Sequence, residues 1–120
     1  MTLALRFLGV GSAQAVALGS ASAVLTRDGA PLLLFDCGPE TLSAYLDAYG
    51  AAPQALFLTH GHLDHIGGME RLYFRVYFDP ELRGRVRVYA PATLVSLNGG
   101  TCVVRSTFAP SHRSRNAPCL

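Results

Sequence analysis

The first part of the chain alternates between apolar and polar residues in a way that predicts three strands. Leu3–Val10 alternates along its length, and Ser20–Thr26 does so again after a loop rich in glycine and small residues. Asp28-Gly29 is a dipeptide typical of a two-residue hairpin turn, and the apolar run Leu32–Phe35 follows it. We therefore predict an antiparallel meander of three strands, and we expect the wholly apolar third strand to be buried.

A helical pattern comes after this meander. Pro39 can begin a helix, Glu40 suits its first turn, and Gly50 can end it. Pro53 then interrupts the chain, and the apolar run Ala55–Leu58 predicts a fourth strand. Between Pro39 and Gly50 the apolar residues recur at helical spacing, which predicts one buried face made of Leu42, Tyr45, Leu46 and Tyr49.

A second helix is predicted over Ile66–Phe78, with a strand over Arg85–Tyr89, where Arg and Val alternate. We expect the Tyr and Phe residues of the segment LYFRVYF to lie in the core, with contact to a substrate as the alternative. Pro91–Leu97 favours the start of another helix. The order of elements predicts a layered domain of the α/β (α+β) class. The apolar face of the second helix would consist of Met69, Leu72, Tyr73 and Val76.

The pattern stops after residue 97, which suggests a domain over residues 1–97 and an atypical, loose tail over residues 98–120. Residues 1–97 carry seven of the ten Arg and all eight acidic residues, for a net charge of −1, whereas the tail carries +3. Because the main part is not basic, its charge argues against a nucleic-acid-binding surface. The change of composition is what a shifted reading frame would produce, so we expect truncation by a frameshift or an early stop.

Composition places the chain among folded proteins outside the membrane. Half of the residues are hydrophobic and 15% are charged, which argues against disorder, and no apolar run is long enough to cross a bilayer. The N-terminus lacks the order of a signal peptide, so a cytoplasmic location is the expectation. The three cysteines have no zinc-ribbon spacing and are odd in number, which argues against a disulfide framework.

Candidate chemistry is concentrated in one segment, THGHLDHIGG, which holds three of the four histidines. His60 and His62 are two residues apart, so in extended backbone their side chains point the same way. Asp64 and His65 follow after a turn and can reach a second position nearby. Imidazole and carboxylate are good ligands for zinc, and the spacing differs from the helical H-E-x-x-H pattern. We therefore predict a metal site in an extended loop.

This segment resembles the H-x-H-x-D-H motif of the metallo-β-lactamase superfamily. Two further segments support the resemblance over residues 3–97: RFLGVGSA looks like the opening strand and loop of the ribonuclease Z-like branch, and LLLFDCGPET looks like the family's strand ending in an aspartate-x-glycine turn. The resemblance implies a four-layer αββα sandwich, of which this chain would be the N-terminal half. An isolated half would leave one face of a sheet uncovered, so we expect self-association.

The resemblance also implies a site for one or two Zn²⁺ ions. His60 and His62 would bind the first ion, Asp64 and His65 the second, and Asp36 would orient the motif loop from behind the ligands. A metal-bound hydroxide would attack an ester or phosphodiester bond, with Asp64 as the catalytic residue that positions or deprotonates it. The expected partner is a small-molecule ester or phosphodiester, with RNA as a further candidate.

The expected ligand set is incomplete in this chain. His112 is the candidate third ligand of the first ion, and an incidental histidine is the alternative. Asp79 could bridge two ions, but the segment FDPEL favours a turn that ends a helix. The glycine loop LGVGSAQ could hold a phosphate, although a tight turn near the site is favoured. The alternative function is therefore a truncated, catalytically incomplete metal-binding fragment or partner subunit.

Overall fold

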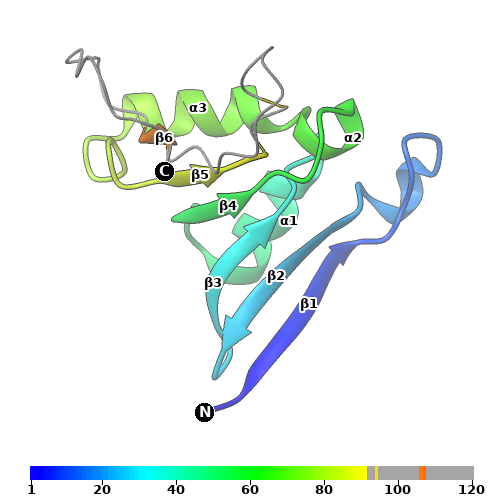
Figure 1. Cartoon of the computed structure of the whole chain (residues 1–120), viewed down its shortest axis with the longest axis horizontal. Coiled ribbons are helices and arrows are strands. Elements are labelled where there is room, and N and C mark those ends of the chain that lie inside the picture. Colours follow the sequence, from blue (N-terminus) through cyan, green and yellow to red (C-terminus); the bar gives the residue numbers. More distant parts are fainter. Residues whose placement is uncertain (92–93, 95–105, 108–120) are drawn as a thin grey trace.

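The computed structural model describes residues 1–91, 94 and 106–107, and it has a mixed α/β architecture as predicted. One sheet of six strands runs in the order β1-β2-β3-β4-β5-β6 (Figure 1). The first three strands are antiparallel, β3, β4 and β5 are parallel, and β6 is antiparallel to β5. The elements are β1 (Leu3–Gly9), η1 (Val16–Leu18), β2 (Ser22–Arg27), β3 (Ala30–Phe35), α1 (Thr41–Tyr49), β4 (Ala55–Phe57), α2 (Leu63–Ile66), α3 (Met69–Phe78), β5 (Arg87–Tyr89) and β6 (Ser106–Thr107).

The hairpin between β2 and β3 confirms the predicted turn. Asp28 and Gly29 both have positive φ, at 50° and 82°, which is the backbone that a two-residue turn between twisted strands requires. The Asp28 carboxylate also accepts a hydrogen bond from the backbone N–H of Thr2 at 2.8 Å, so the turn is tied to the start of the neighbouring strand. The predicted three-stranded meander therefore forms, and it is set by local turn chemistry.

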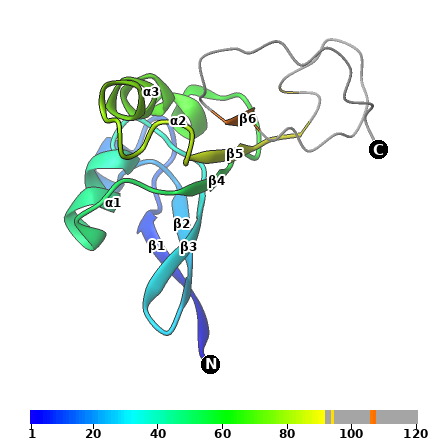
Figure 2. The same cartoon turned by 90° about the vertical axis from the view of Figure 1, so that its left-hand side faces the viewer.

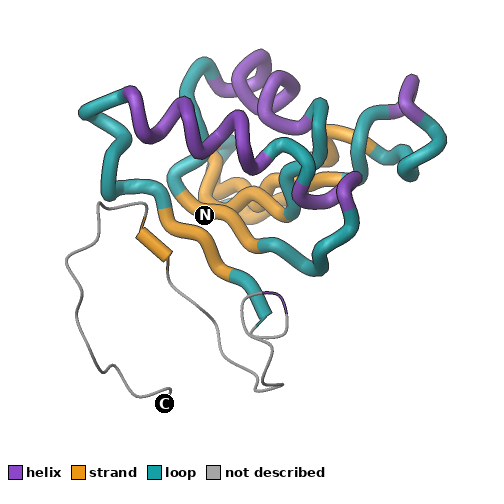
Figure 3. Tube along the Cα trace, turned by 90° about the horizontal axis from the view of Figure 1, so that it is seen from above, coloured by secondary structure: helices purple, strands orange, loops and turns teal. Residues whose placement is uncertain are grey.

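The helices α1 and α3 lie on one side of the sheet (Figures 2 and 3). Helix α1 ends as predicted, because Gly50 adopts φ 71° and its N–H donates to the carbonyl of Leu46 at 2.8 Å. Side chains from both helices meet one face of the central strands and form a single apolar core. Its main members are Val24, Leu34, Leu42, Tyr45, Leu56, Leu72, Val76 and Val88.

The predicted helix over Ile66–Phe78 is wrong in one respect, because it is split into α2 and α3. Gly67 and Gly68 separate the two helices, and the N–H of Gly68 donates to the carbonyl of Cys37 at 2.8 Å. A Cβ at Gly68 would lie 2.3 Å from the carbonyl oxygen of Gly38, so the chain passes too close to another loop for a side chain. This crossing interrupts the helix, and helical periodicity alone does not reveal it.

The other face of the sheet is apolar, and no described helix covers it. On β1, the side chains of Leu3, Leu5 and Phe7 are between 54% and 66% exposed, while Val24 and Leu34 point toward the helices and are buried. The expectation that the whole run Leu32–Phe35 is buried is therefore wrong, since Leu34 alone is fully buried, Leu33 and Phe35 are half-buried and Leu32 is exposed. Successive side chains of a strand point to opposite sides of the sheet, so each side of this sheet has its own apolar face.

The aromatic residues of α3 also depart from the expectation. Leu72 and Val76 are fully buried, but the Tyr and Phe residues that flank them lie outside the core. Tyr77 stacks on Tyr73, and Phe78 stacks on Phe74, so the rings form an exposed ladder along the helix. Leu72 and Val76, one helical turn apart, are buried in the core and Met69 packs against it, because the sheet lies along one side of the helix.

The remaining expectations concern the end of the chain and the membrane. Most of the predicted helix Pro91–Leu97 and the boundary after residue 97 lie outside the described residues. Leu94 is described, and its N–H donates to the carbonyl of Pro91 at 2.9 Å. Within the segment expected to be a loose tail, Ser106–Thr107 forms β6 and pairs with β5. None of the helices in the described part is long and apolar enough to span a bilayer, and the cytoplasmic location stays a prediction.

Candidate active site at the end of β4

The histidine motif begins where β4 ends. His62 is still extended, with φ −71° and ψ 146°, and it caps the short helix α2, whose first turn contains Asp64 and His65. The carbonyl of His62 accepts the N–H groups of His65 and Ile66 at 2.9 and 3.0 Å. The motif is therefore extended in its first half and helical in its second. The expectation of an extended loop throughout was wrong for Asp64 and His65.

Asp36 is the hub that holds this motif in place. It follows β3, is 5% exposed, and has a φ of 61°, a left-handed conformation that Asp tolerates better than most residues. Its carboxylate accepts the backbone N–H of Thr59 at 2.7 Å, the Thr59 hydroxyl at 2.8 Å and Nδ1–H of His65 at 2.8 Å. Asp36 thus connects the ends of two adjacent parallel strands and orients one imidazole, and its expected role behind metal ligands stays a prediction.

Thr59 is a site residue that the sequence analysis missed. Besides binding Asp36, its hydroxyl lies 2.9 Å from Nδ1 of His60. Because the hydroxyl donates its only proton to the Asp36 carboxylate, it must accept the proton of His60 Nδ1. His60 then carries its lone pair on Nε2, and by the same reasoning so does His65. The position of Thr59, directly before the first histidine of the motif, is the signal that could have revealed it.

Three imidazole rings converge at this point. The ring centroid of His60 lies 4.0 Å from that of His65 and 4.6 Å from that of His62. Asp64 approaches from the same helix turn, with Oδ2 3.4 Å from Nε2 of His65. Two acceptor atoms at this distance repel each other unless a proton or a cation lies between them. The cluster is therefore arranged to take up positive charge.

Cys37 fixes the helical half of the motif through its backbone. Its N–H donates to the carbonyl of His65 at 2.7 Å, and its carbonyl accepts the N–H of Gly68 at 2.8 Å. A Cβ at Gly38 would lie 2.2 Å from the carbonyl oxygen of Asp64, so the two loops are in direct contact. Burial raises the pKa of the Cys37 thiol to about 11, so this cysteine is a neutral packing residue at physiological pH.

The described residues do not form a complete metal site. Among residues 1–91, 94 and 106–107, no group of three or more His, Cys, Asp and Glu is arranged to hold a metal ion, which corrects the expectation of a metal-binding motif. Asp64 and His65 offer one pair of atoms at suitable separation, and His60 and His62 stand beside them. His112 lies outside the described residues. Asp79 ends α3 and accepts the N–H of Glu81 at 2.9 Å, so it forms the predicted turn. Its carboxylate is engaged in that turn, which argues against a bridge between two metal ions.

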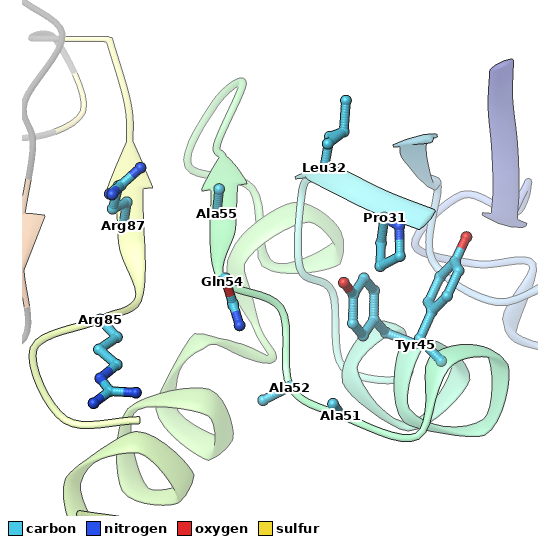
Figure 4. Close-up of a pocket in the computed structure, with 10 residues that line it drawn as sticks. Pro31, Leu32, Tyr45, Ala51, Ala52, Gln54, Ala55, Arg85 and Arg87 are labelled. Carbon is cyan, nitrogen blue, oxygen red and sulfur yellow. The ribbon is translucent and has the colours of Figure 1, made fainter. Parts of the chain in front are cut away.

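Two hollows of similar size lie at opposite ends of the sheet. The first, of about 380 Å³, opens beside His65 and Asp36 and extends over the apolar face, where Phe7 and Phe35 line it. The second, of about 360 Å³, lies at the starts of β3 and β4 (Figure 4), where Tyr45 comes from α1, Arg87 from β5 and Arg85 from the turn before it. The described residues that line the second hollow include no His, Cys, Asp or Glu, whereas Asp36 and His65 line the first.

Comparison with known proteins identifies the family. The sequence model of the family described as Anti-Pycsar protein Apyc1 matches residues 3–97. The chain belongs to this family. The assignment to the metallo-β-lactamase superfamily and its ribonuclease Z-like branch is thereby corrected, and with it the function inferred from that resemblance, a zinc hydrolase of that superfamily.

Individual relatives agree with the family match. An Anti-Pycsar protein Apyc1 of Paenibacillus harenae is 37% identical over 62% of this chain and 31% of its own length. Its counterpart in Paenibacillus xerothermodurans is 32% identical over 83% of this chain and 42% of its own length. An atrochrysone carboxyl ACP thioesterase of Aspergillus fumigatus is 37% identical over 70% of this chain and 30% of its own length. The chain thus spans less than half the length of the curated relatives it matches.

Proposed function

We propose that the chain takes part in the hydrolysis of a cyclic nucleotide, as part of an anti-Pycsar protein that antagonises a phage defence. The observation that carries this proposal is the convergence of three imidazoles and the Asp64 carboxylate at the end of β4. Hydrolysis of a cyclic phosphodiester needs a group that accepts a proton from water and donors that face the phosphate oxygens. In the cluster, the Asp64 carboxylate can accept the proton and the exposed His62 ring can donate to the phosphate.

The chemistry assigns a role to each side chain. Water adds to phosphorus, the bond from phosphorus to one sugar oxygen breaks, and that oxygen receives a proton, which leaves a linear nucleoside monophosphate. Asp64 accepts the proton from water, and its neighbour His65 is kept in one tautomer by Asp36. His60 and His62 are exposed, so their rings can face the phosphate, while the leaving oxygen takes a proton from solvent and Asp64 releases to solvent the proton that it accepted.

A divalent cation is proposed as the cofactor, with zinc as the first candidate. In tetrahedral zinc sites with ligand distances of about 2.0–2.2 Å, two ligand atoms lie about 3.4 Å apart, and His65 Nε2 and Asp64 Oδ2 are separated by 3.4 Å. A bound cation would supply electrostatic stabilisation of the phosphate. Further ligands would come from His60 and His62 after a change of side-chain conformation, or from outside the described residues.

The metal proposal is tested by the zinc content of the purified protein. Wild-type protein and the His65→Ala and Asp47→Asn variants are dialysed against the same zinc buffer and measured by mass spectrometry. Asp47 is exposed on α1, far along the chain from the motif, so its variant should keep the wild-type content. Equal zinc in the His65→Ala variant and the wild type would exclude His65 as a ligand.

A second candidate function is thioester hydrolysis, because one relative is named a thioesterase. The geometry of the site does not distinguish a cyclic nucleotide from a thioester, because both reactions add water to an electrophilic centre. The main part of the chain carries a net charge of −1, so a long RNA is a weaker candidate than a small cyclic phosphodiester. One set of assays with both kinds of substrate distinguishes the two functions.

The decisive experiment follows product formation by chromatography. The purified chain is incubated with pyrimidine and purine 3′,5′-cyclic nucleotides and with an acyl thioester. We expect linear nucleoside monophosphate from the wild type and a loss of about 100-fold or more in the Asp64→Asn variant, which lacks the proton acceptor. The Asp47→Asn variant should stay within about twofold of the wild type. Absence of nucleotide product, with thioester cleaved instead, would replace the proposed function by the second candidate, and no product from either would overturn both.

A further inference from the structure

The hollow beside His65 is built from two kinds of residue. At its base, His65 and Asp36 are hydrogen-bonded to each other at 2.8 Å, so their polar atoms in this direction already have partners. Its walls come from the uncovered face of the sheet and from the loop after β1. Phe7, Val10, Ala23 and Phe35 line the walls, and Asp36 and His65 lie at the base.

The walls favour an uncharged, flat part of a ligand. Phe7 is 66% exposed and Val10 is 65% exposed, whereas Phe35 is held partly buried by its contact with Phe57, with ring centroids 6.2 Å apart. Single exposed apolar residues are ordinary on protein surfaces. Here two Phe rings and a Val border one hollow that ends at the catalytic cluster, and a volume of about 380 Å³ lies within the range of ligand sites.

Charge decides which part of the substrate lies in the hollow. Among the described residues that line it, Asp36 bears the only carboxylate, and no Arg or Lys is present. A phosphate placed there would meet a negative group without a cation to compensate for it. His60 and His62 are exposed and do not line the hollow, so their rings suit the phosphate, and the base end of a nucleotide is the part that fits the hollow.

We propose that this hollow is the subsite for the nucleobase of a cyclic nucleotide, and that the Phe7 ring is the surface on which the base stacks. The inference rests on the proposed function and adds the orientation of the substrate to it. Stacking on an aromatic ring tolerates any base, because every base has a π-face. The one hydroxyl among the wall residues, that of Ser22, donates to the carbonyl of Ser20. The subsite should therefore discriminate little between pyrimidine and purine.

The test compares Phe7→Ala with Leu5→Ala. Leu5 lies two residues earlier on the same face of β1 and is 57% exposed, but it does not line the hollow, so it is a matched control. We expect Phe7→Ala to raise KM for cyclic nucleotides by about 5- to 150-fold, the equivalent of one lost stacking contact, with kcat little changed. Leu5→Ala should leave KM unchanged, and Phe7→Trp should restore it. For a ribose cyclic phosphate without a base, wild type and Phe7→Ala should have the same KM.

A binding measurement separates this inference from the proposed function. Saturation-transfer NMR with cytidine and adenosine, which carry no phosphate, reports contact with the base without any turnover. We expect transfer to the base protons with wild type and Leu5→Ala, and its loss with Phe7→Ala. Equal transfer with all three proteins, or none with the wild type, would overturn the subsite even if cyclic nucleotides are hydrolysed. Transfer that depends on Phe7 without any hydrolysis would retain the subsite and overturn the proposed reaction.

Discussion

Replacing Asp36 by Ala should destabilise the protein far more than its single position suggests. The carboxylate is buried and accepts three hydrogen bonds, from the N–H and hydroxyl of Thr59 and from His65. Hydrogen bonds to a charged group contribute about 1.5–3 kcal/mol each, and an N–H left unpaired in a buried position costs about 1–3 kcal/mol. Because such losses are not additive, we expect about 3–5 kcal/mol for the network, against a total stability of about 5–15 kcal/mol for a typical domain.

Asp28→Ala is the matched control for this prediction. Asp28 also has a left-handed backbone, with a φ of 50°, and also accepts a backbone N–H at 2.8 Å, but the bond is exposed to solvent. Both variants therefore incur the same backbone cost of Ala at positive φ, about 1 kcal/mol. The difference between them isolates the part-buried bonds to Thr59 and His65, for which we expect about 2–4 kcal/mol.

The free energies of unfolding come from urea titrations followed by circular dichroism and extrapolated linearly to zero denaturant. Asp36→Asn keeps one acceptor for the Thr59 N–H and should fall between the wild type and Asp36→Ala, so it provides a measurement even if the alanine variant does not fold. If Asp36→Ala and Asp28→Ala lose the same free energy within about 0.5 kcal/mol, the hub formed by Asp36 has no special role in stability.

Four further predictions concern packing. In a variant with Cys102 and Cys119 replaced by Ser, Cys37 should react with Ellman's reagent at pH 8 only as fast as the protein unfolds. The reason is that burial raises the pKa of the Cys37 thiol from 9.0 to about 11. Immediate reaction in the native protein would contradict the burial of Cys37. The stability linked to this thiol should be complete below pH 9 and decline as the pH rises toward 11. The part of the apolar sheet face outside the hollow should make the chain elute above its monomer mass of 12.8 kDa, and Leu3→Lys should shift it toward the monomer; a wild-type monomer at all concentrations would refute this. Gly68→Ala should cost more than about 2 kcal/mol, since its Cβ would lie 2.3 Å from a backbone oxygen, and an unchanged urea midpoint would show that the crossing has room.

Local chemistry made much of the fold predictable. The Asp28-Gly29 turn, the cap at Gly50 and the alternation along the strands all depend on residues close together in sequence, and all three appear in the structure. The prediction failed where distant segments decide the outcome. The exposed aromatic ladder on α3 is one case, because a helical pattern rich in Tyr and Phe does not reveal how much of the helix surface the sheet can cover.

The family assignment was corrected for a different reason. A short histidine motif reports the chemistry of its side chains, and related spacing recurs in proteins of different names and substrates. The match over residues 3–97 depends on the whole of that range, so it discriminates between families more finely than the motif does.

The sequence by itself determined that His60, His62 and His65 would lie near one another, because six residues of chain cannot carry them far apart. It also made Asp36 a candidate partner of the motif. Only the tertiary structure decided that Asp36 reaches Thr59 and His65, since this contact requires β3 and β4 to be adjacent and parallel, with their ends at the same edge of the sheet. The apolar wall that leads from Phe7 to His65 has the same origin. It reaches His65 because β4 pairs in parallel with β3 and so places the motif beside Phe35 and Asp36, and a local pattern contains no information about that pairing.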